Sequence, residues 1–244
     1  MQVHLFGSEF RLLHRLKSKK NRVYLVENRD GRFLLKVYRA PHHQHSAVEY
    51  RVLREAYRKK AAVPQPLAFT EKKALLMEYL TGENLCDRLN HSCLPEYADM
   101  LAAWFAHFHR CFGRPSGITL LRGDSNLRNF IIHPDGTLFG VDFEEAVTGK
   151  PDRDIGQICA SILDTEPAFT PAKAALCRRL IARYGCCTGR RDLEQDLTGP
   201  IAAALRESAR RRLRQRRYLS REAALLERKG LPRYLDLVMK KPQA

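Results

Sequence analysis

Two short stretches near the middle of the chain carry side chains that suit phosphoryl transfer. Residues 122–130 read RGDSNLRNF and residues 141–145 read VDFEE, so four residues separate Asp124 from Asn129, and Asp142 follows Asn129 by 13. A carboxylate can orient or deprotonate a hydroxyl, while an amide oxygen and a second carboxylate can hold the magnesium ions that bridge ATP phosphates. The pattern predicts Asp124 as the catalytic residue and Asn129 and Asp142 as magnesium ligands.

The segment between Asn129 and Asp142 indicates how these side chains are positioned. A strand-like run, FII, at 130–132 precedes a Pro-Asp-Gly turn at 134–136. Proline, aspartate and glycine favour tight turns, and apolar runs on either side of such a turn are typical of paired strands. We therefore expect a hairpin that carries metal ligands at both ends.

The order of several motifs resembles the aminoglycoside phosphotransferase branch of the protein-kinase-like superfamily, which is related to small atypical kinases and sugar-lipid kinases. The segments FLLKVY at 33–38, AVEYRVL around Glu49 and LLMEYLTG at 75–82 precede the central stretches in the family's order, over roughly the first two-thirds of the chain. The resemblance implies a bilobal α+β fold. Residues 1–80 would form an N-lobe with a small antiparallel β-sheet, one helix and the hinge, and residues 81–244 a mainly α-helical C-lobe with the catalytic and metal-binding loops.

The resemblance also implies roles for residues outside the central stretches. Lys36 would grip the α- and β-phosphates, and Glu49 would pair with that lysine. Asp154, in DRDIG at 152–156, would brace the catalytic loop from the following helix, with Arg122 as a second supporting residue. Adenine would be held by backbone groups of the hinge residues Met77, Glu78, Tyr79 and Leu80.

The sequence departs from the family pattern in three places. Arg122 stands where the catalytic loop usually begins with histidine, so the support under the loop is built differently or is missing. The first turn reads KSKKN at 17–21 instead of a glycine-rich sequence, which makes Lys19 and Asn21 the candidate phosphate-binding residues. The triplet that begins at Asp142 is Asp-Phe-Glu rather than Asp-Phe-Gly, a change that small-molecule and sugar kinases tolerate.

Hydrophobic periodicity predicts the elements around these motifs. Residues 22–27 and 32–38 flank an Asp-Gly turn and indicate a β-hairpin. Residues 46–60 and 96–112 carry apolar side chains at helical intervals, and a further helix is expected from Pro171 onward. The stripe in 96–112 is wide enough for a core helix.

The role of Glu49 has a competing interpretation. Ser46 and Glu49 have the spacing of a helix capping box, in which the glutamate binds the backbone at the start of the helix. A Glu49 that serves the cap cannot also pair fully with Lys36, and Glu55 would then be the partner of the lysine. The resemblance favours Glu49.

Cysteine and histidine spacing does not indicate zinc or a disulfide framework. The seven cysteines are odd in number and have no C-x-x-C pair. Three histidines in four residues at 42–45 have no cysteine or carboxylate beside them, and a solvated turn is the favoured interpretation. His107 and His109 are expected to be hydrogen-bonded structural residues rather than catalytic ones.

Charge is distributed unevenly along the chain. The net charge is +16; residues 1–80 contribute +10 and residues 206–221 contribute +7, so the remainder is near −1. Residues Arg206–Arg217 include seven arginines, with Leu205, Ala209 and Leu213 forming an apolar stripe. Guanidinium groups bind phosphates well, so this helix is a candidate site for RNA or an acidic lipid surface, with a merely solvated helix as the alternative.

Composition limits the remaining possibilities. With 244 residues and 44% hydrophobic content, the chain can bury a core as one domain or two lobes. Its longest apolar runs fall far short of the ~20 residues that cross a bilayer. The first ten residues lack the features of a secretory signal, and we expect a cytoplasmic location.

The combined motifs predict an ATP- and magnesium-dependent phosphotransferase that moves the γ-phosphoryl group to a hydroxyl of a small metabolite or sugar. Cationic aminoglycosides fit poorly, because residues 84–94 contain only one acidic residue, Asp87. Two alternatives remain open at this point: an atypical serine/threonine protein kinase, and a non-catalytic scaffold that binds RNA or another polyanion.

Overall fold

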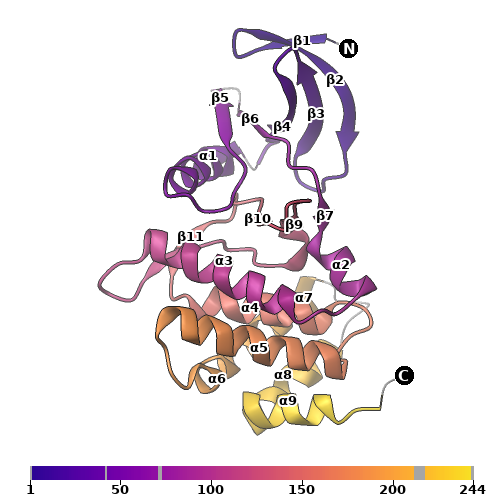
Figure 1. Cartoon of the computed structure of the whole chain (residues 1–244), viewed down its shortest axis with the longest axis vertical. Coiled ribbons are helices and arrows are strands. Elements are labelled where there is room, and N and C mark those ends of the chain that lie inside the picture. Colours follow the sequence, from indigo (N-terminus) through magenta and orange to yellow (C-terminus); the bar gives the residue numbers. More distant parts are fainter. Residues whose placement is uncertain (1, 42, 71–72, 212–217, 243–244) are drawn as a thin grey trace. The chain divides into compact units, whose positions relative to one another are not determined.

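The computed structural model describes residues 2–41, 43–70, 73–211 and 218–242 (Figure 1). The chain divides into two compact units. The first comprises Met1–Gly82 and His133–Ala146, and the second comprises Glu83–Ile132 and Val147–Ala244. The segment that carries Asp142 therefore packs with the amino-terminal part of the chain.

The first unit is built on a six-stranded antiparallel sheet with the order β1-β2-β3-β4-β6-β5. Its strands are β1 (Gln2–Leu5), β2 (Ser8–Leu16), β3 (Arg22–Asn28), β4 (Gly31–Val37), β5 (Pro66–Phe69) and β6 (Ala74–Glu78). The predicted hairpin is present as β3 and β4, which pair from Arg22–Val37 to Asn28–Gly31. The buried core of the sheet includes Phe10, Val26, Leu35 and Leu76.

Helix α1 (His43–Arg58) packs against β5 and β6 in the same unit (Figure 1). Glu49, Val52, Leu53 and Ala56 lie on its buried side, because spacings of three and four residues return to one face of a helix. The short strand β10 (Leu138–Gly140) is attached through Gly140, whose N–H donates to the Ala62 carbonyl at 3.0 Å.

The start of α1 differs from two of the sequence predictions. The capping box is wrong: the helix begins three residues before Ser46, whose Oγ donates to the His43 carbonyl at 2.6 Å. The solvated histidine turn is also wrong in part, because His43 and His45 belong to the first turn of α1. His42 lies outside the described residues.

The second unit is mainly helical. Its shorter elements are β7 (Glu83–Asn84), α2 (Leu85–His91), β8 (Thr119–Leu121), the 3₁₀ turn η1 (Leu127–Asn129), β9 (Phe130–Ile132), β11 (Val147–Gly149) and α6 (Leu193–Asp196). Its longer helices are α3 (Glu96–Phe112), α4 (Asp152–Asp164), α5 (Pro171–Thr188), α7 (Thr198–Arg211), α8 (Tyr218–Lys229) and α9 (Leu231–Met239). The predicted α+β class with an antiparallel amino-terminal sheet is confirmed.

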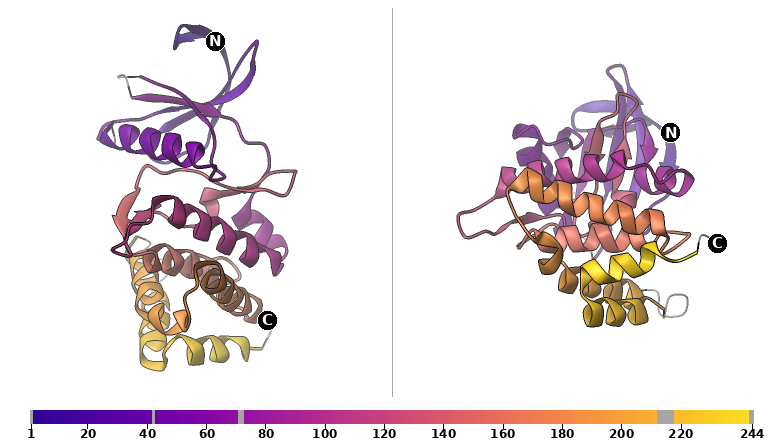
Figure 2. Two further views of the ribbon diagram at one scale, coloured as in Figure 1. Left: turned by 60° about the vertical axis from the view of Figure 1, so that its left-hand side comes forward. Right: turned by 60° about the horizontal axis from the view of Figure 1, so that its bottom comes forward.

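Helix α3 is the core helix that the apolar stripe predicted. Leu101, Phe105 and Phe108 are fully buried, and the rings of Trp104 and Phe108 stack with centroids 5.0 Å apart. Helix α3 packs against α5, and α4 packs against α7 (Figure 2). No helix of the described residues is long and apolar enough to span a bilayer.

The α4–α7 contact depends on Gly156. A Cβ added there would lie 2.6 Å from Pro200 Cβ and 2.7 Å from the Pro200 carbonyl carbon, closer than atoms can pack. We expect Gly156→Ala to lower the free energy of unfolding by about 1–3 kcal/mol through overpacking. Chemical denaturation measures the change.

Gly199, near the start of α7, supplies the matched control for this substitution. Nothing lies within 4 Å of a Cβ added at Gly199, so Gly199→Ala should be neutral or stabilise by up to ~1 kcal/mol. Equal losses in both variants would contradict the close approach of α4 to α7.

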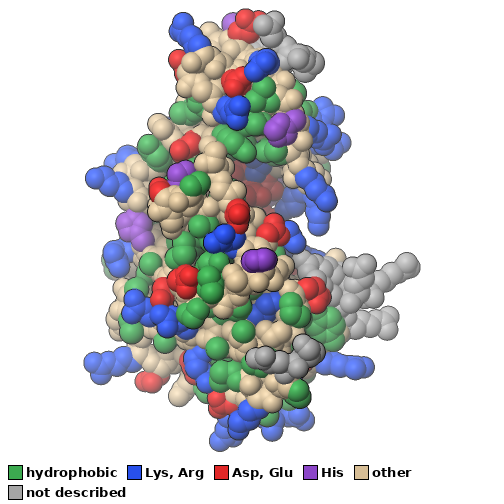
Figure 3. Space-filling model, turned by 45° about the vertical axis from the view of Figure 1, so that its right-hand side comes forward, with side chains coloured by type: hydrophobic (Ala, Val, Ile, Leu, Met, Phe, Trp, Pro, Cys, Tyr) green, Lys and Arg blue, Asp and Glu red, His purple; other side chains and the backbone are tan. Residues whose placement is uncertain are grey.

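The predicted basic helix corresponds to α7, of which the structure describes residues up to Arg211; residues 212–217 lie outside the described part. Leu205 and Ala209 are buried, as the apolar stripe predicted. Arg206 pairs with Glu227, and Arg210 and Arg211 pair with Glu207. On the face that Figure 3 shows, Lys and Arg side chains are dispersed rather than gathered. An anionic partner for this helix stays a prediction.

Candidate active site

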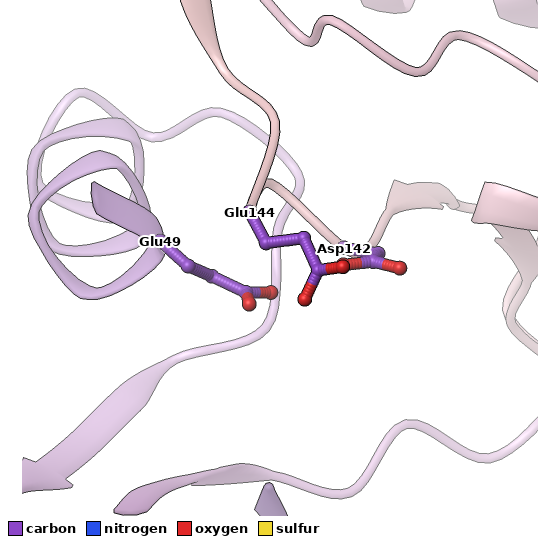
Figure 4. Close-up of side chains that lie close together, drawn as sticks. All are labelled: Glu49, Asp142 and Glu144. Atoms are coloured by element: carbon purple, nitrogen blue, oxygen red, sulfur yellow. The ribbon is translucent and has the colours of Figure 1, made fainter. Parts of the chain in front are cut away.

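Lys36, near the end of β4, lies among three carboxylates in the first unit. Its Nζ is 2.7 Å from Glu49 Oε2, 2.8 Å from Asp142 Oδ1 and 3.1 Å from Glu144 Oε2. Glu49 comes from the buried face of α1, and the two other acids follow β10 (Figure 4). Three segments distant in sequence therefore meet at one ammonium group.

The contacts of Glu49 decide between its two interpretations in favour of the pairing with Lys36. Besides the lysine, Glu49 accepts a hydrogen bond from the Tyr38 hydroxyl and one from the Phe143 N–H at 3.2 Å. Both carboxylate oxygens are thus engaged while the side chain is only 1% exposed. A buried charge persists only when it is paired and hydrogen-bonded in this way. Glu55 instead pairs with Arg58 and Lys59.

Burial and charge act on the ionisation of this pair in opposite directions. Burial raises the pKa of Glu49, and the ammonium of Lys36 opposes that rise only in part. Burial would lower the pKa of Lys36, but the carboxylates of Glu49, Asp142 and Glu144 together raise it above its usual value. Lys36 therefore remains cationic at neutral pH, as phosphate binding requires.

Glu144 is a member of this cluster that the sequence prediction did not include. Oxygen atoms of Glu49, Asp142 and Glu144 lie within 4.8 Å of one another. Glu144 is buried, and its Oε2 accepts from Asn21 Nδ2 at 2.5 Å, while its backbone carbonyl is 2.7 Å from His45 Nδ1. Its position two residues after Asp142 was the available signal, since that spacing places a second acid beside the first.

Asp142 itself has a left-handed backbone conformation, with φ of 64°. Aspartate and asparagine tolerate this region better than most residues other than glycine. The side chain of Asp142 is 42% exposed, in contrast to the enclosed Glu49. Asp142 is therefore the carboxylate of this cluster that a cation from solvent can reach most readily.

The turn between β2 and β3 joins this cluster through residues that only partly match the prediction. Asn21 is buried and binds Glu144, whereas Lys19 is exposed. Lys20 is the lysine of this turn that contacts acidic residues: its Nζ pairs with Glu145 and lies 3.5 Å from Glu144 Oε1. The sequence alone did not show that Lys20, rather than Lys19, would make these contacts.

The predicted hinge follows the central part of the sheet. Met77 and Glu78 end β6, and Tyr79 and Leu80 continue the chain. Glu78 and Gln65 exchange two hydrogen bonds: the Glu78 N–H donates to the Gln65 carbonyl at 2.9 Å, and Glu78 Oε2 accepts from the Gln65 N–H at 3.0 Å. These contacts fix the backbone at the end of β6.

In the second unit, Asp124 and Asn129 lie in one loop between β8 and β9. Asn129 Nδ2 donates to the Asp124 carbonyl at 3.0 Å and to Asp124 Oδ2 at 3.2 Å. Because the amide nitrogen is used within the loop, the amide oxygen is the atom of Asn129 that suits a cation. Both side chains are only partly buried.

Asp154, at the start of α4, anchors this loop. Its Oδ1 accepts from Ser125 Oγ at 2.8 Å, and its Oδ2 accepts from the Arg122 N–H at 2.9 Å. His109 Nε2 lies 3.1 Å from the same Oδ2, and His109 Nδ1 lies 2.8 Å from the Tyr184 hydroxyl. The buried His109 is thus a hydrogen-bonded structural residue, as expected, and it supports Asp154.

Two further side chains of α4 hold the loop. Gln157 accepts from the Ser125 N–H at 3.2 Å and donates to the Gly123 carbonyl at 3.2 Å. Ser161 Oγ accepts from the Leu127 N–H at 3.1 Å. Neither residue was predicted, because polar residues on a helix give no sequence signal of the loop that they contact.

The support at Arg122 is built differently from the family's histidine. The Arg122 side chain is fully buried, and its guanidinium carbon lies 4.6 Å from the Phe130 ring centroid and 5.2 Å from that of Trp104. Arginine planes stack favourably on aromatic rings. The side chain therefore packs the loop onto the aromatic core of α3, while its backbone reaches Asp154.

Comparison with known proteins agrees with this arrangement. The model of the Phosphotransferase enzyme family, APH, matches residues 14–122. The chain is similar to this family over that segment and has a kinase-like fold. The predicted resemblance to the aminoglycoside phosphotransferase branch is confirmed, and so is the kinase-like fold. No curated protein matches the sequence at a significant level.

Solved structures similar to this chain share its fold at low sequence identity. An ethanolamine kinase from Plasmodium vivax is 11% identical, with a TM-score of 0.61 over 95% of this chain and 77% of that one. An aminoglycoside phosphotransferase from Streptomyces rimosus is 14% identical, with a TM-score of 0.59 over 93% and 92%. An amicoumacin kinase is 12% identical, with a TM-score of 0.60 over 94% and 87%.

The donor atoms of the described residues suit the magnesium ion and the phosphates that the sequence predicted. Carboxylate and amide oxygens are the ligands that magnesium prefers, and Asp142, Glu144 and Asn129 offer them. A buried lysine that stays cationic suits phosphate oxygens.

Proposed function

We propose that this protein is a phosphotransferase that transfers the γ-phosphoryl group of ATP to a hydroxyl of a small metabolite or sugar, in a magnesium-dependent reaction. The observation that carries the proposal is the buried Lys36–Glu49 pair with Asp142 Oδ1 at 2.8 Å from the lysine. Similar structures support it: an amicoumacin kinase contains AMP-PNP and Ca²⁺, and the Streptomyces rimosus enzyme contains ADP and streptomycin.

Asp124, Asn129 and Asp142 have separate roles in the proposed reaction. Asp124 orients the acceptor hydroxyl and takes its proton as the oxygen attacks phosphorus. The new bond joins the acceptor oxygen to the γ-phosphorus, and the bond between that phosphorus and the β–γ bridging oxygen breaks, so ADP leaves with the bridging oxygen. Asn129 and Asp142 would hold magnesium, which would neutralise phosphate charge.

The nucleotide-binding residues complete the proposal. Lys36 binds the α- and β-phosphates, positioned by Glu49, and Lys19 and Asn21 approach the phosphates from the first turn. Adenine is held by backbone groups of Met77–Leu80. Use of ATP also favours a cytoplasmic location.

A screen of hydroxyl compounds tests this function. The purified protein is incubated with ATP, magnesium and each candidate acceptor, and ADP release is measured. We expect at least one acceptor to accelerate ADP release, with Asp124→Asn as the inactive control. Radiolabel that appears on protein rather than on a small acceptor would assign the activity to a protein kinase. Labelling of neither would contradict phosphoryl transfer.

A further inference from the structure

A cavity of about 760 Å³ lies within the second unit, and neither Asp124 nor Asn129 lines it. It is bordered by the ends of α3 and α5, the turn at 113–118 and the start of α4. Small-molecule sites usually measure about 300–1,000 Å³, so this cavity has room for a ligand of sugar size. The proposed phosphoryl transfer does not use it.

Cations dominate the wall of this cavity. Arg110, Arg114, Lys150 and Arg190 line it, and Arg190 is held by the carboxylates of Asp152 and Asp196. Among the residues that the structure describes, no carboxylate forms an ion pair with Arg110, Arg114 or Lys150. Arg190 pairs with both acids of the wall, so the four cations and two carboxylates together leave a net charge of +2 for a ligand.

Other groups around the cavity also bear on its ligand. Helix α4 begins at Pro151 and Asp152 without a side-chain cap, and the amino end of a helix attracts anions. The carboxyl ends of α3 and α5 act in the opposite sense, but Arg110 lies in the last turn of α3 and donates to the Cys187 carbonyl at 3.4 Å. The balance of charge favours an anion.

The cavity also has buried polar and apolar lining residues. His109 and Tyr184 line it, are buried and are hydrogen-bonded to each other. Ile118 and Pro151 supply apolar surface, and Ser116 supplies a hydroxyl. A bare phosphate ion would fill only a small part of this volume.

We propose that this cavity binds a small phosphorylated metabolite of sugar size. Its phosphate is held by Arg114, Lys150 and Arg110, and its organic body lies against Ile118 and Pro151. Arginine and lysine bind phosphate through charge-assisted hydrogen bonds, which are stronger than neutral ones. The proposal concerns binding alone and does not rest on the proposed phosphoryl transfer.

Calorimetric titration of the full chain without ATP tests the proposal. The probes are glucose 6-phosphate, inorganic phosphate and glucose. We expect saturable binding of the sugar phosphate, at least about tenfold weaker binding of phosphate alone, and none of glucose. Arg114→Glu/Lys150→Glu should weaken sugar-phosphate binding by about tenfold or more.

The matched control is Arg221→Glu/Arg228→Glu, which makes the same change in charge on exposed residues of α8 that do not line the cavity. It should bind within about twofold of the unaltered protein. Equal weakening in both double variants would indicate non-specific attraction and overturn the proposal. So would binding of inorganic phosphate as tight as that of the sugar phosphate.

A second measurement does not depend on variants that fold. Cys187 lines the cavity, and its neighbour Cys186 does not, although both thiols are exposed. Saturating glucose 6-phosphate should slow alkylation of Cys187 by iodoacetamide at least about threefold, with little effect on Cys186, as followed by fragment mass spectrometry. Unchanged labelling of Cys187 at saturation would place the ligand elsewhere and overturn the proposal.

Discussion

Replacing Asp142 with asparagine is expected to lower magnesium-dependent phosphoryl transfer about a thousandfold, which corresponds to roughly 4 kcal/mol of transition-state stabilisation. Asparagine removes the charge that would hold the metal but tolerates the left-handed backbone at this position, where φ is 64°. Alanine would add backbone strain to the chemical effect. Steady-state rates with a screened acceptor measure the loss.

The control for Asp142→Asn is Asp30→Asn. Asp30 is an exposed acid in the turn between β3 and β4 of the same unit, and its loss should leave the rate within about twofold. The unfolding midpoint of Asp142→Asn should stay close to that of the original protein, since Lys36 keeps two other carboxylates. A rate that is unchanged in Asp142→Asn would rule out its role as a metal ligand.

Replacing Lys36 with methionine is expected to lower the free energy of unfolding by about 3–5 kcal/mol, because the substitution leaves the buried Glu49 carboxylate without its counter-ion. The proposed transfer reaction should also be lost, since phosphate would lose its buried cation. Chemical denaturation measures the first effect. Lys36→Met/Glu49→Gln should recover most of the stability and none of the activity.

The stability of Lys36→Met should also depend on pH. Burial raises the pKa of Glu49 above its ordinary value of 4.5, and removal of the lysine takes away the charge that opposes this rise. The folded state then binds a proton more tightly than the unfolded state does. The free energy of unfolding should therefore fall as the pH rises from 4.5 through the folded-state pKa.

Lys59→Met is the matched control for burial. Lys59 Nζ lies 3.1 Å from Glu55 Oε1, a distance close to that of the Lys36–Glu49 pair, but both side chains are about one-third exposed. Solvent screens such a pair, so its loss should cost less than ~1 kcal/mol. Equal costs for the two lysines, or a stability of Lys36→Met that does not vary with pH, would contradict a buried charge at Glu49.

Local sequence patterns were sufficient to predict much of the scaffold. Alternation around the Asp-Gly turn identified β3 and β4, and the stripe in 96–112 identified α3, because these patterns follow directly from strand and helix geometry. The order of motifs identified the kinase-like fold, which the family model and similar structures confirm. The roles of the site residues stay predictions.

The contacts that support the loop between β8 and β9 could not be predicted, because they join residues far apart in sequence. His109 and Asp154 are 45 residues apart, and Tyr184 is a further 30 from Asp154. The error at Ser46 has a similar cause: a capping-box spacing is local, but the tertiary pairing of Glu49 with Lys36 offered the carboxylate a buried counter-ion. Tertiary electrostatics outweighed the local signal.

Helix α4 meets the loop that carries Asp124 and Asn129 through side chains at 154, 157 and 161, spaced by three and four residues, and it meets α7 through Gly156. A slip of one residue along this helix would therefore break all of its polar links to the loop together. Substitutions at the contact with α7 that shift α4 would therefore also shift the loop, although they lie outside it.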